Sequence, residues 1–389
     1  MSISIISIII SAVALFISIV SPLFNALFRT PYPKDNTAHE DDENTTNDSR
    51  HKDTPVSIVI VAHDNAAELE RSLPIFLSQE YESDYQVIIV TDKSDSETDD
   101  IIKRFSHHQN LYATFMPLSS RYISRKKLAI TLGIKAAKHP WVIVTDAWCH
   151  PKDSQWLRSF ASYCSESKDI VLGYTTFDKT APARYSYEHT LHAAYHLWFA
   201  TRTKAISTNS HLVAIRKQLF LDEDGFLGNL KYVRGEYSFL VNKYSTELNT
   251  AVALSKTSFL EEDTPFKKRW TNNHLFDINS HNSLAGFAKH KALYYLDNSW
   301  LLLSIFAFIL AITYGVLLQD WIVLSAAILS FALNFLLRAL LSRKTLSALD
   351  CRVSCFVIPL LDYSQPFCDL VWRIRYRFAD KYDFITHKI

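Results

Sequence analysis

Acidic and polar side chains follow several apolar runs of this 389-residue chain, in positions where they could bind a polar ligand. The run WVIVTDA contains Asp146 near its end, and the run YQVIIVT is followed by Asp92. The run VSIVIVA is followed by His63, Asp64 and Asn65. Carboxylates and imidazoles can orient a ligand through hydrogen bonds or share a divalent cation. The alternative is that these are ordinary turn residues that cap the following helices.

Strand and helix patterns alternate around these residues. Short β-rich apolar runs predict buried strands at 56–62, 85–91, 111–117 and 141–147. Stretches with helical spacing lie between them, at 66–79, 96–108 and 124–139. The alternation predicts an α/β fold with a doubly wound, mostly parallel sheet. Because ligands bind such sheets at the carboxyl ends of the strands, His63, Asp92 and Asp146 are expected to converge on one crevice.

Glycine content limits the kinds of nucleotide site that this chain can form. The chain has only 7 glycines, and no G-x-G-x-x-G or Walker A motif follows the first strand. A bound diphosphate would need neutralisation by a metal held by acids, or by Arg125, Lys126 and Lys127. Those bases could equally be solvated residues at a helix start. The net charge of +1 gives no electrostatic case for a nucleic-acid partner.

Three apolar runs without charged side chains, at 1–28, 298–319 and 321–337, are long enough to cross a bilayer core of roughly 30 Å. The first predicts an uncleaved transmembrane anchor, because a cleaved signal normally has a basic start. The other two predict a transmembrane hairpin within 298–341. Lys and Arg side chains follow the first and third runs, so the positive-inside rule places the middle region and the tail in the cytoplasm.

The remaining segments connect these parts. The acidic stretch at 29–54 predicts a disordered linker, and the globular region is expected at 55–290. The tail at 342–389 predicts a cytoplasmic segment on the membrane surface, although a helix packed on the globular domain fits as well. One helical face carries His189, His192 and His196, which could bind a metal or form a polar surface.

Three segments of the chain, VSIVIVAHDNAAELERSLPIFLSQEY, YQVIIVTD and SRKKLAITLGIKAAKHPWVIVTDAWCHP, resemble the bacterial membrane-anchored family 2 glycosyltransferases of GT-A fold. The likeness covers roughly 55–276. It implies a nucleotide-diphosphate sugar donor, inverting transfer to a membrane lipid or lipid-linked glycan, and a role in glycan or polysaccharide synthesis at the bacterial inner membrane.

The resemblance also implies roles for individual residues. Ala62, His63 and Asp92 would face the nucleoside, and Lys127 would lie near the nucleotide. Asp146 would be the first acid of a D-x-D motif that coordinates Mg²⁺ or Mn²⁺ between the two phosphates.

The sequence departs from this family pattern in the motifs that carry chemistry. D-x-D reads Asp146-Ala147-Trp148, and an indole cannot ligate a metal; His150 is the candidate replacement ligand. The acidic cluster reads Gly235-Glu236-Tyr237-Ser238, which leaves Glu236 as the general base. Two hypotheses follow. The favoured one is an active membrane-bound glycosyltransferase, with a metal or a basic side chain as charge stabiliser. The other is an inactive relative that acts as a binding partner or scaffold.

Overall fold

The computed structural model describes residues 4–29, 54–117 and 124–380. The predicted linker at 29–54 lies, apart from its two ends, outside the described residues. The chain divides into two compact units. The sheet unit comprises the described parts of Pro31–Ala181, His196–Ala285 and Phe378–Ile389. The helical unit comprises the described parts of Met1–Thr30, Pro182–Tyr195 and Gly286–Arg377.

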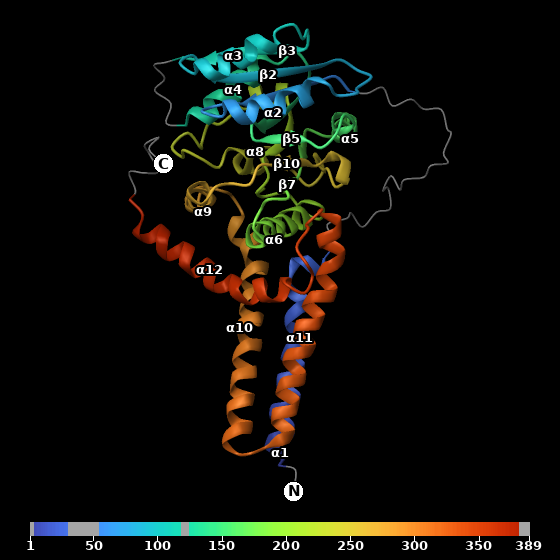
Figure 1. Ribbon diagram of the computed structural model, residues 1–389, viewed down its shortest axis with the longest axis vertical. Helices are drawn as coiled ribbons and strands as arrows, with labels where there is room; N and C mark the ends of the chain where they lie inside the picture. Colours follow the sequence, from blue (N-terminus) through green and yellow to red (C-terminus); the bar gives the residue numbers. More distant parts are fainter. Residues whose placement is uncertain (1–3, 30–53, 118–123, 381–389) are drawn as a thin grey trace, which may run out of the picture. The chain divides into compact units, whose positions relative to one another are not determined.

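A seven-stranded sheet forms the centre of the sheet unit, in the order β3-β2-β1-β4-β8-β6-β9 (Figure 1). Its bounds are β1 Val56–Val61, β2 Tyr85–Asp92, β3 Leu111–Met116, β4 Trp141–Asp146, β6 Ile170–Leu172, β8 Leu212–Arg216 and β9 Thr250–Val252. Strands β3, β2, β1 and β4 are parallel, whereas β8 runs antiparallel to both β4 and β6. The predicted α/β fold with a mostly parallel sheet is confirmed, and all four predicted strands are present.

Helices cover both faces of this sheet. Side chains alternate along β1, so Ile58 and Ile60 pack on one face while Val59 and Val61 pack on the other. The first face is covered by α2 Ala66–Leu77, α3 Ser96–Phe105 and α5 Trp156–Ala161. The second face is covered by α4 Arg125–Ala136, α7 Lys217–Asp222 and α8 Glu236–Tyr244. Burial on both faces explains why the central strands read as continuous apolar runs.

A second, three-stranded sheet was not predicted from the sequence. Its strands are β5 Cys149–Pro151, β10 Leu260–Glu262 and β7 Thr175–Phe177, in the order β5-β10-β7. Strand β10 pairs antiparallel with β5 and brings Glu262 opposite Cys149. The helix α9 Lys267–His281 follows β10 in the chain. These elements supply the other side chains of the candidate site.

The helical unit contains three helices that are long and apolar enough to cross a membrane: Ile5–Phe24, Phe287–Leu317 and Trp321–Ala348. They correspond to α1 Ile5–Val20 with the short helix η1 Ser21–Phe24, to α10 and to α11. Figure 1 shows α10 and α11 as a hairpin beside α1. Small side chains let such helices approach closely. A Cβ added at Gly315 would lie 2.7 Å from the Cγ of Leu324.

Two buried charged residues, Asp297 and Arg338, lie in the helices of the candidate spans, just outside the uncharged runs predicted from the sequence. The helices extend beyond the apolar runs, so α10 includes Asp297 and α11 includes Arg338. Arg338 is fully buried, forms an ion pair with Asp362 and donates to the Oγ of Ser21 at 2.8 Å. Tyr195 donates to Asp297 at 2.9 Å. These partners lower the cost of burying the charges.

The C-terminal tail is largely helical. The helix α12 spans Ile358–Phe378 and contains Pro366, and Asp362 on α12 supplies the carboxylate that pairs with Arg338. The helix α6 Ala183–Ala200 contributes its first part to the helical unit. Asp362 also accepts a hydrogen bond from Tyr187 of α6 at 2.7 Å. The tail is therefore fixed to the helical unit by buried polar contacts.

Candidate functional site

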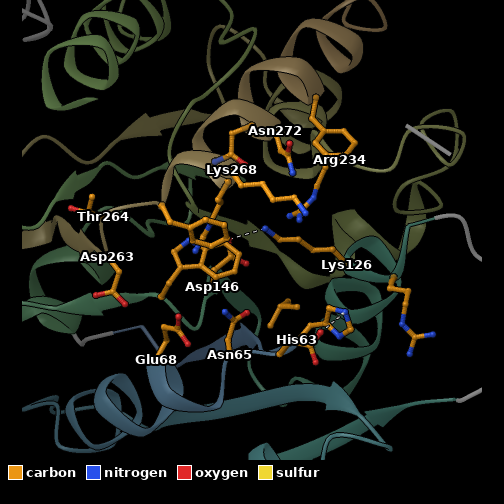
Figure 2. A pocket seen from close by; sticks show the side chains of 18 of the residues that line it. His63, Asn65, Glu68, Lys126, Asp146, Arg234, Asp263, Thr264, Lys268 and Asn272 are labelled. Atoms are coloured by element: carbon orange, nitrogen blue, oxygen red, sulfur yellow. Dashed lines mark hydrogen bonds and ion pairs between the residues drawn. The ribbon is translucent and has the colours of Figure 1, made fainter. Parts of the chain in front are cut away.

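A cleft with a volume of about 660 Å³ opens at the carboxyl ends of β1 and β4 (Figure 2). His63, Asn65 and Glu68 follow β1, and Asp146 ends β4. Residues from the start of α4 and from α9 complete the lining, among them Arg125, Lys126, Lys268, Arg269 and Asn272. The sheet thus brings polar strand ends to one place, as the topology requires.

Lys126 lies between two carboxylates at the bottom of the cleft. Its Nζ atom is 2.7 Å from Oδ2 of Asp146 and 2.7 Å from Oε1 of Glu236. Gly235, at φ 87°, begins the turn into α8 and so places Glu236 at the first position of that helix. A Cβ on Gly235 would come within 2.5 Å of Ser280 Cβ, so only glycine fits there. The ammonium group therefore has a fixed position between two acids.

Trp148 forms part of the cleft wall and does not fill the cleft. Its side chain is largely buried, with an exposed fraction of 9%. The guanidinium of Arg269 stacks 3.6 Å from the centre of the indole, and Lys126 Nζ lies 5.0 Å from it. Both contacts have the geometry of a cation–π interaction. Trp148 thereby holds two positive side chains at the place where the D-x-D motif would supply its second acid.

Two buried polar atoms around Lys126, Nε1 of Trp148 and Oε2 of Glu236, have no hydrogen-bond partner among the described residues. The hydroxyl of Tyr237 lies within hydrogen-bonding reach of the Asp146 carboxylate. Leaving a buried polar atom unpaired typically costs about 1–3 kcal/mol. Folded proteins rarely gather unpaired polar groups in this way except where a ligand or water completes them. These unpaired atoms are consistent with a ligand or water beside Lys126.

Asp92 links two residues that line the cleft. It is buried, its carboxylate forms an ion pair with Arg125, and its Oδ2 lies 2.5 Å from Nδ1 of His63. Ala62 is also buried, and its N–H donates to the carbonyl of Val90 at 3.0 Å. His63 therefore lines the cleft, whereas Asp92 and Ala62 are absent from the described lining and lie beneath it.

Lys127 points away from the cleft, although the family resemblance implied a place near the nucleotide. Its Nζ donates to the carbonyl of Asn229 at 2.9 Å and to that of Tyr232 at 2.5 Å. Burial lowers the pKa of Lys127 to about 8, and nearby Glu236 only partly opposes this shift. Lys127 therefore anchors the loop that precedes Arg234. The neighbouring Lys126 is the lysine that reaches the cleft.

Glu236 is not a well-placed general base in this structure. Its side chain is buried, and it is absent from the described lining of the cleft. Burial alone would raise its pKa, but Lys126 and Arg234 outweigh burial and lower the pKa to about 2. A carboxylate of such low basicity accepts a proton poorly at neutral pH. Its evident role is to hold Lys126.

Two acids, Asp178 and Asp263, line the opposite side of the cleft and were not predicted from the sequence. Asp263 follows β10, and burial raises its pKa although Arg71 pairs with it at 2.9 Å. Asp178 differs, because hydrogen bonds from Thr180 and Thr264 outweigh burial and lower its pKa. In the sequence, Asp263 is marked only as a polar residue directly after a short strand.

A catalytic divalent metal does not fit the residues at Asp146. One carboxylate oxygen of Asp146 already faces the Lys126 ammonium, and Trp148 offers no ligand atom. His150 does not replace the missing acid, because it is absent from the described lining and its Nε2 lies 3.8 Å from Glu261. The positive charge at this place is therefore supplied by side chains of the chain itself.

Residues 57–223 match a family model described as "Glycosyl transferase family 2". No curated protein matches the sequence significantly. Among solved structures, the mannosyltransferase PcManGT from Pyrobaculum calidifontis, in complex with GDP-Man and Mn²⁺, is similar with 14% identity and a TM-score of 0.53. That similarity covers 93% of this chain and 99% of PcManGT. S. aureus TarS 1–349 in complex with UDP-GlcNAc has 14% identity over 83% of this chain and 92% of TarS, with a TM-score of 0.42.

Proposed function

Residues 57–223 form a family 2 glycosyltransferase domain of GT-A fold, and from this premise we propose that the chain is an active, metal-independent glycosyltransferase. It transfers a sugar, with inversion, from a nucleotide-diphosphate donor to a membrane lipid or lipid-linked glycan. The observation that carries the proposal is the Lys126 ammonium between Asp146 and Glu236, among unpaired buried polar atoms.

Positive side chains take the part of the metal in this proposal. Lys126 and Arg269 contact the Trp148 indole, and Lys268 and Arg234 line the same cleft. The whole lining is nearly balanced, with six Lys and Arg against five Asp and Glu, but these four bases lie together on the side of Trp148, where they can face a diphosphate. At a separation of 4 Å and an effective dielectric constant of 20, each pair of unit charges interacts by roughly 4 kcal/mol. Stabilising the leaving diphosphate in this way needs positive charge rather than a particular metal.

An acid on the opposite side of the cleft can take the proton of the acceptor hydroxyl. Asp263 is better suited than Glu236, because burial raises its pKa and its carboxylate faces the cleft. As the hydroxyl oxygen attacks the anomeric carbon, Asp263 accepts its proton and the bond to the diphosphate breaks. Attack from the side opposite the leaving group inverts the configuration of the sugar.

The helical unit supports a membrane acceptor. It holds three helices that are long and apolar enough to span a bilayer. Arg338, Arg343 and Lys344 lie in the second half of α11, after its most apolar part, and no base lies between α10 and α11. By the positive-inside rule, this distribution favours a multi-pass protein of the bacterial inner membrane with its sheet unit in the cytoplasm, where nucleotide sugars are available.

Titration of the full-length chain in detergent with UDP and GDP tests the proposal, with Mn²⁺ in one series and EDTA in another. We expect one of the nucleotides to bind with the same affinity in both series. Binding that requires Mn²⁺ would contradict metal independence while leaving a transferase. Absence of binding to either nucleotide would favour the inactive scaffold.

A matched pair of variants shows whether the nucleotide occupies the described cleft. Arg269→Met removes a guanidinium that lines the cleft, whereas Arg158→Met removes an exposed one that is absent from the described lining. Loss of a charge-assisted hydrogen bond worth about 1.5–3 kcal/mol predicts roughly a 10- to 100-fold weaker affinity for Arg269→Met only. Equal effects of the two variants would place the nucleotide elsewhere.

A further inference from the structure

Three side chains with metal-ligating atoms meet behind the Trp148 wall of the cleft. Cys149 begins β5, His211 directly precedes β8, and Glu262 ends β10. One ligating atom from each of them lies within 4.8 Å of the other two. A search of the described residues for three or more His, Cys, Asp or Glu side chains close enough to share a metal ion finds this group.

These three residues are held in place by burial and by hydrogen bonds, among them one from Thr175 Oγ1 to Oε2 of Glu262 at 3.0 Å. Cys149 is fully buried, and Glu262 is buried with its Oε2 atom 3.0 Å from Nδ1 of His211. The Tyr237 ring packs against the His211 ring at 5.5 Å. The site therefore brings together three different ligand types: a thiol, an imidazole and a carboxylate.

We propose that Cys149, His211 and Glu262 bind one Zn²⁺ ion with a structural role. A thiolate, an imidazole and a carboxylate are ligands that Zn²⁺ accepts in tetrahedral geometry, while a thiolate disfavours Mg²⁺ and Mn²⁺. On binding, the Cys149 thiol releases its proton to solvent and the thiolate sulfur bonds to the ion. Water would supply the fourth ligand.

The position of the three ligands explains what such an ion would stabilise. Cys149 and Glu262 are paired opposite each other in the three-stranded sheet. His211 leads into β8 of the seven-stranded sheet. One ion would therefore tie the two sheets together beneath Trp148, whose ring lies 5.8 Å from the His211 ring. This role differs from that of a catalytic cation, because Lys126 occupies the place at Asp146.

Metal analysis of the purified full-length chain tests this proposal. We expect about one zinc per chain after dialysis, and less than about a tenth of that in Cys149→Ala and His211→Ala. Cys164→Ala is the matched control, since Cys164 is another buried free cysteine of the sheet unit outside the three ligands. It should retain zinc. Retention of zinc by Cys149→Ala and His211→Ala would contradict the assignment.

A spectroscopic measurement on the wild-type chain tests whether a thiolate binds the metal, even if the variants fail to fold. Replacement of zinc by Co²⁺ in the wild-type chain should give an absorption band from thiolate-to-cobalt charge transfer. A chain that contains no zinc and binds neither Zn²⁺ nor Co²⁺ would overturn the proposal. Nucleotide affinity is measured separately, so failure of the zinc site and failure of the proposed transferase function can be distinguished.

Discussion

Single side chains decide whether this cleft requires a metal. In the wild-type chain the Lys126 ammonium contacts Asp146, and Trp148 stands where a second acid would be needed. An ammonium and a divalent cation cannot share one carboxylate oxygen at close range, because their charges repel. In the proposed function Lys126 and Trp148 therefore act together: Lys126 occupies the carboxylate of Asp146, and Trp148 withholds the second acid that a metal would need.

The double variant Lys126→Met with Trp148→Asp should convert nucleotide binding from metal-independent to Mn²⁺-dependent. The first change removes the ammonium, and the second restores the D-x-D pattern with Asp146. We expect EDTA to weaken nucleotide binding of the double variant by at least about tenfold, and to leave the wild type unchanged. Isothermal titration with and without Mn²⁺ measures this. Trp148→Asp alone should gain no such dependence while Lys126 remains.

Asp263→Asn should lower turnover by about 10²- to 10⁴-fold without changing nucleotide affinity, since loss of a general base affects only the chemical step. Burial raises the pKa of Asp263, so its carboxylate becomes protonated at a higher pH than that of an ordinary aspartate. As the pH is lowered, wild-type activity should therefore begin to fall at that higher pH. Asp178→Asn is the control, because Asp178 lines the same cleft and hydrogen bonds lower its pKa. Equal losses in both variants would remove Asp263 from the role.

Helix α4 illustrates how an element selects the side chains that serve the site. Ala129, Ile130 and Ile134 of α4 pack against the sheet. This packing fixes the rotation of the helix, so Lys126 faces the cleft while Lys127 faces the loop at 229–234. Successive residues on a helix point about 100° apart, and for that reason two adjacent lysines have different roles here.

Lys127→Met should destabilise the sheet unit and weaken nucleotide binding through the loop that carries Arg234. The substitution leaves the carbonyls of Asn229 and Tyr232 without their donor, at about 1–3 kcal/mol for each group that stays unpaired. The pKa of Lys127 falls from 10.5 to about 8 on folding. Between about pH 8 and 10.5, Lys127 is protonated in the unfolded chain and largely unprotonated in the folded chain. The free energy of unfolding of the wild type should therefore rise with pH in this range.

Urea unfolding of wild type and Lys127→Met across pH 7 to about 11 checks this prediction. Subtraction of the two curves isolates the contribution of Lys127. A difference that stays flat over this pH range would show that Lys127 has the same pKa in both states.

The sequence predicted those elements whose signal is local. The strands β1, β2 and β4 are buried on both faces and read as apolar runs, so Asp92 and Asp146 were correctly placed at strand ends. The three-residue strands β5 and β10 carry no periodic pattern, and their pairing joins Cys149 to Glu262 over a long chain separation. The rotation of α4 likewise depends on tertiary packing. The sequence therefore named Lys126 only together with Arg125 and Lys127, and it did not indicate Asp263.

At the scale of the whole molecule, the helical unit depends on its buried charges. Arg338 of α11 bonds to Asp362 of α12, to Ser21 near the end of α1 and to Asn334 of its own helix. Removing one partner of a buried ion pair leaves the other charge without compensation. The pair thus links segments from both ends of the chain.

Arg338→Leu should destabilise the full-length protein by about 3–5 kcal/mol, because Asp362 becomes an unpaired buried charge. The double variant Arg338→Leu with Asp362→Leu should recover part of that loss. Thermal unfolding in detergent measures both. Arg343→Leu serves as control, since Arg343 is an exposed base five residues further along α11. A double variant no more stable than Arg338→Leu would refute the pairing argument.

The discontinuous make-up of the helical unit also limits how this protein can be shortened. Residues 182–195 lie in the middle of the chain, yet Tyr187 and Tyr195 donate to Asp362 and Asp297. A fragment cut out at 55–285 for crystallisation would retain both tyrosines and lose both acceptors. Its α6 would present newly exposed hydroxyls and rings to solvent, so such a fragment should aggregate unless that segment is redesigned together with the termini.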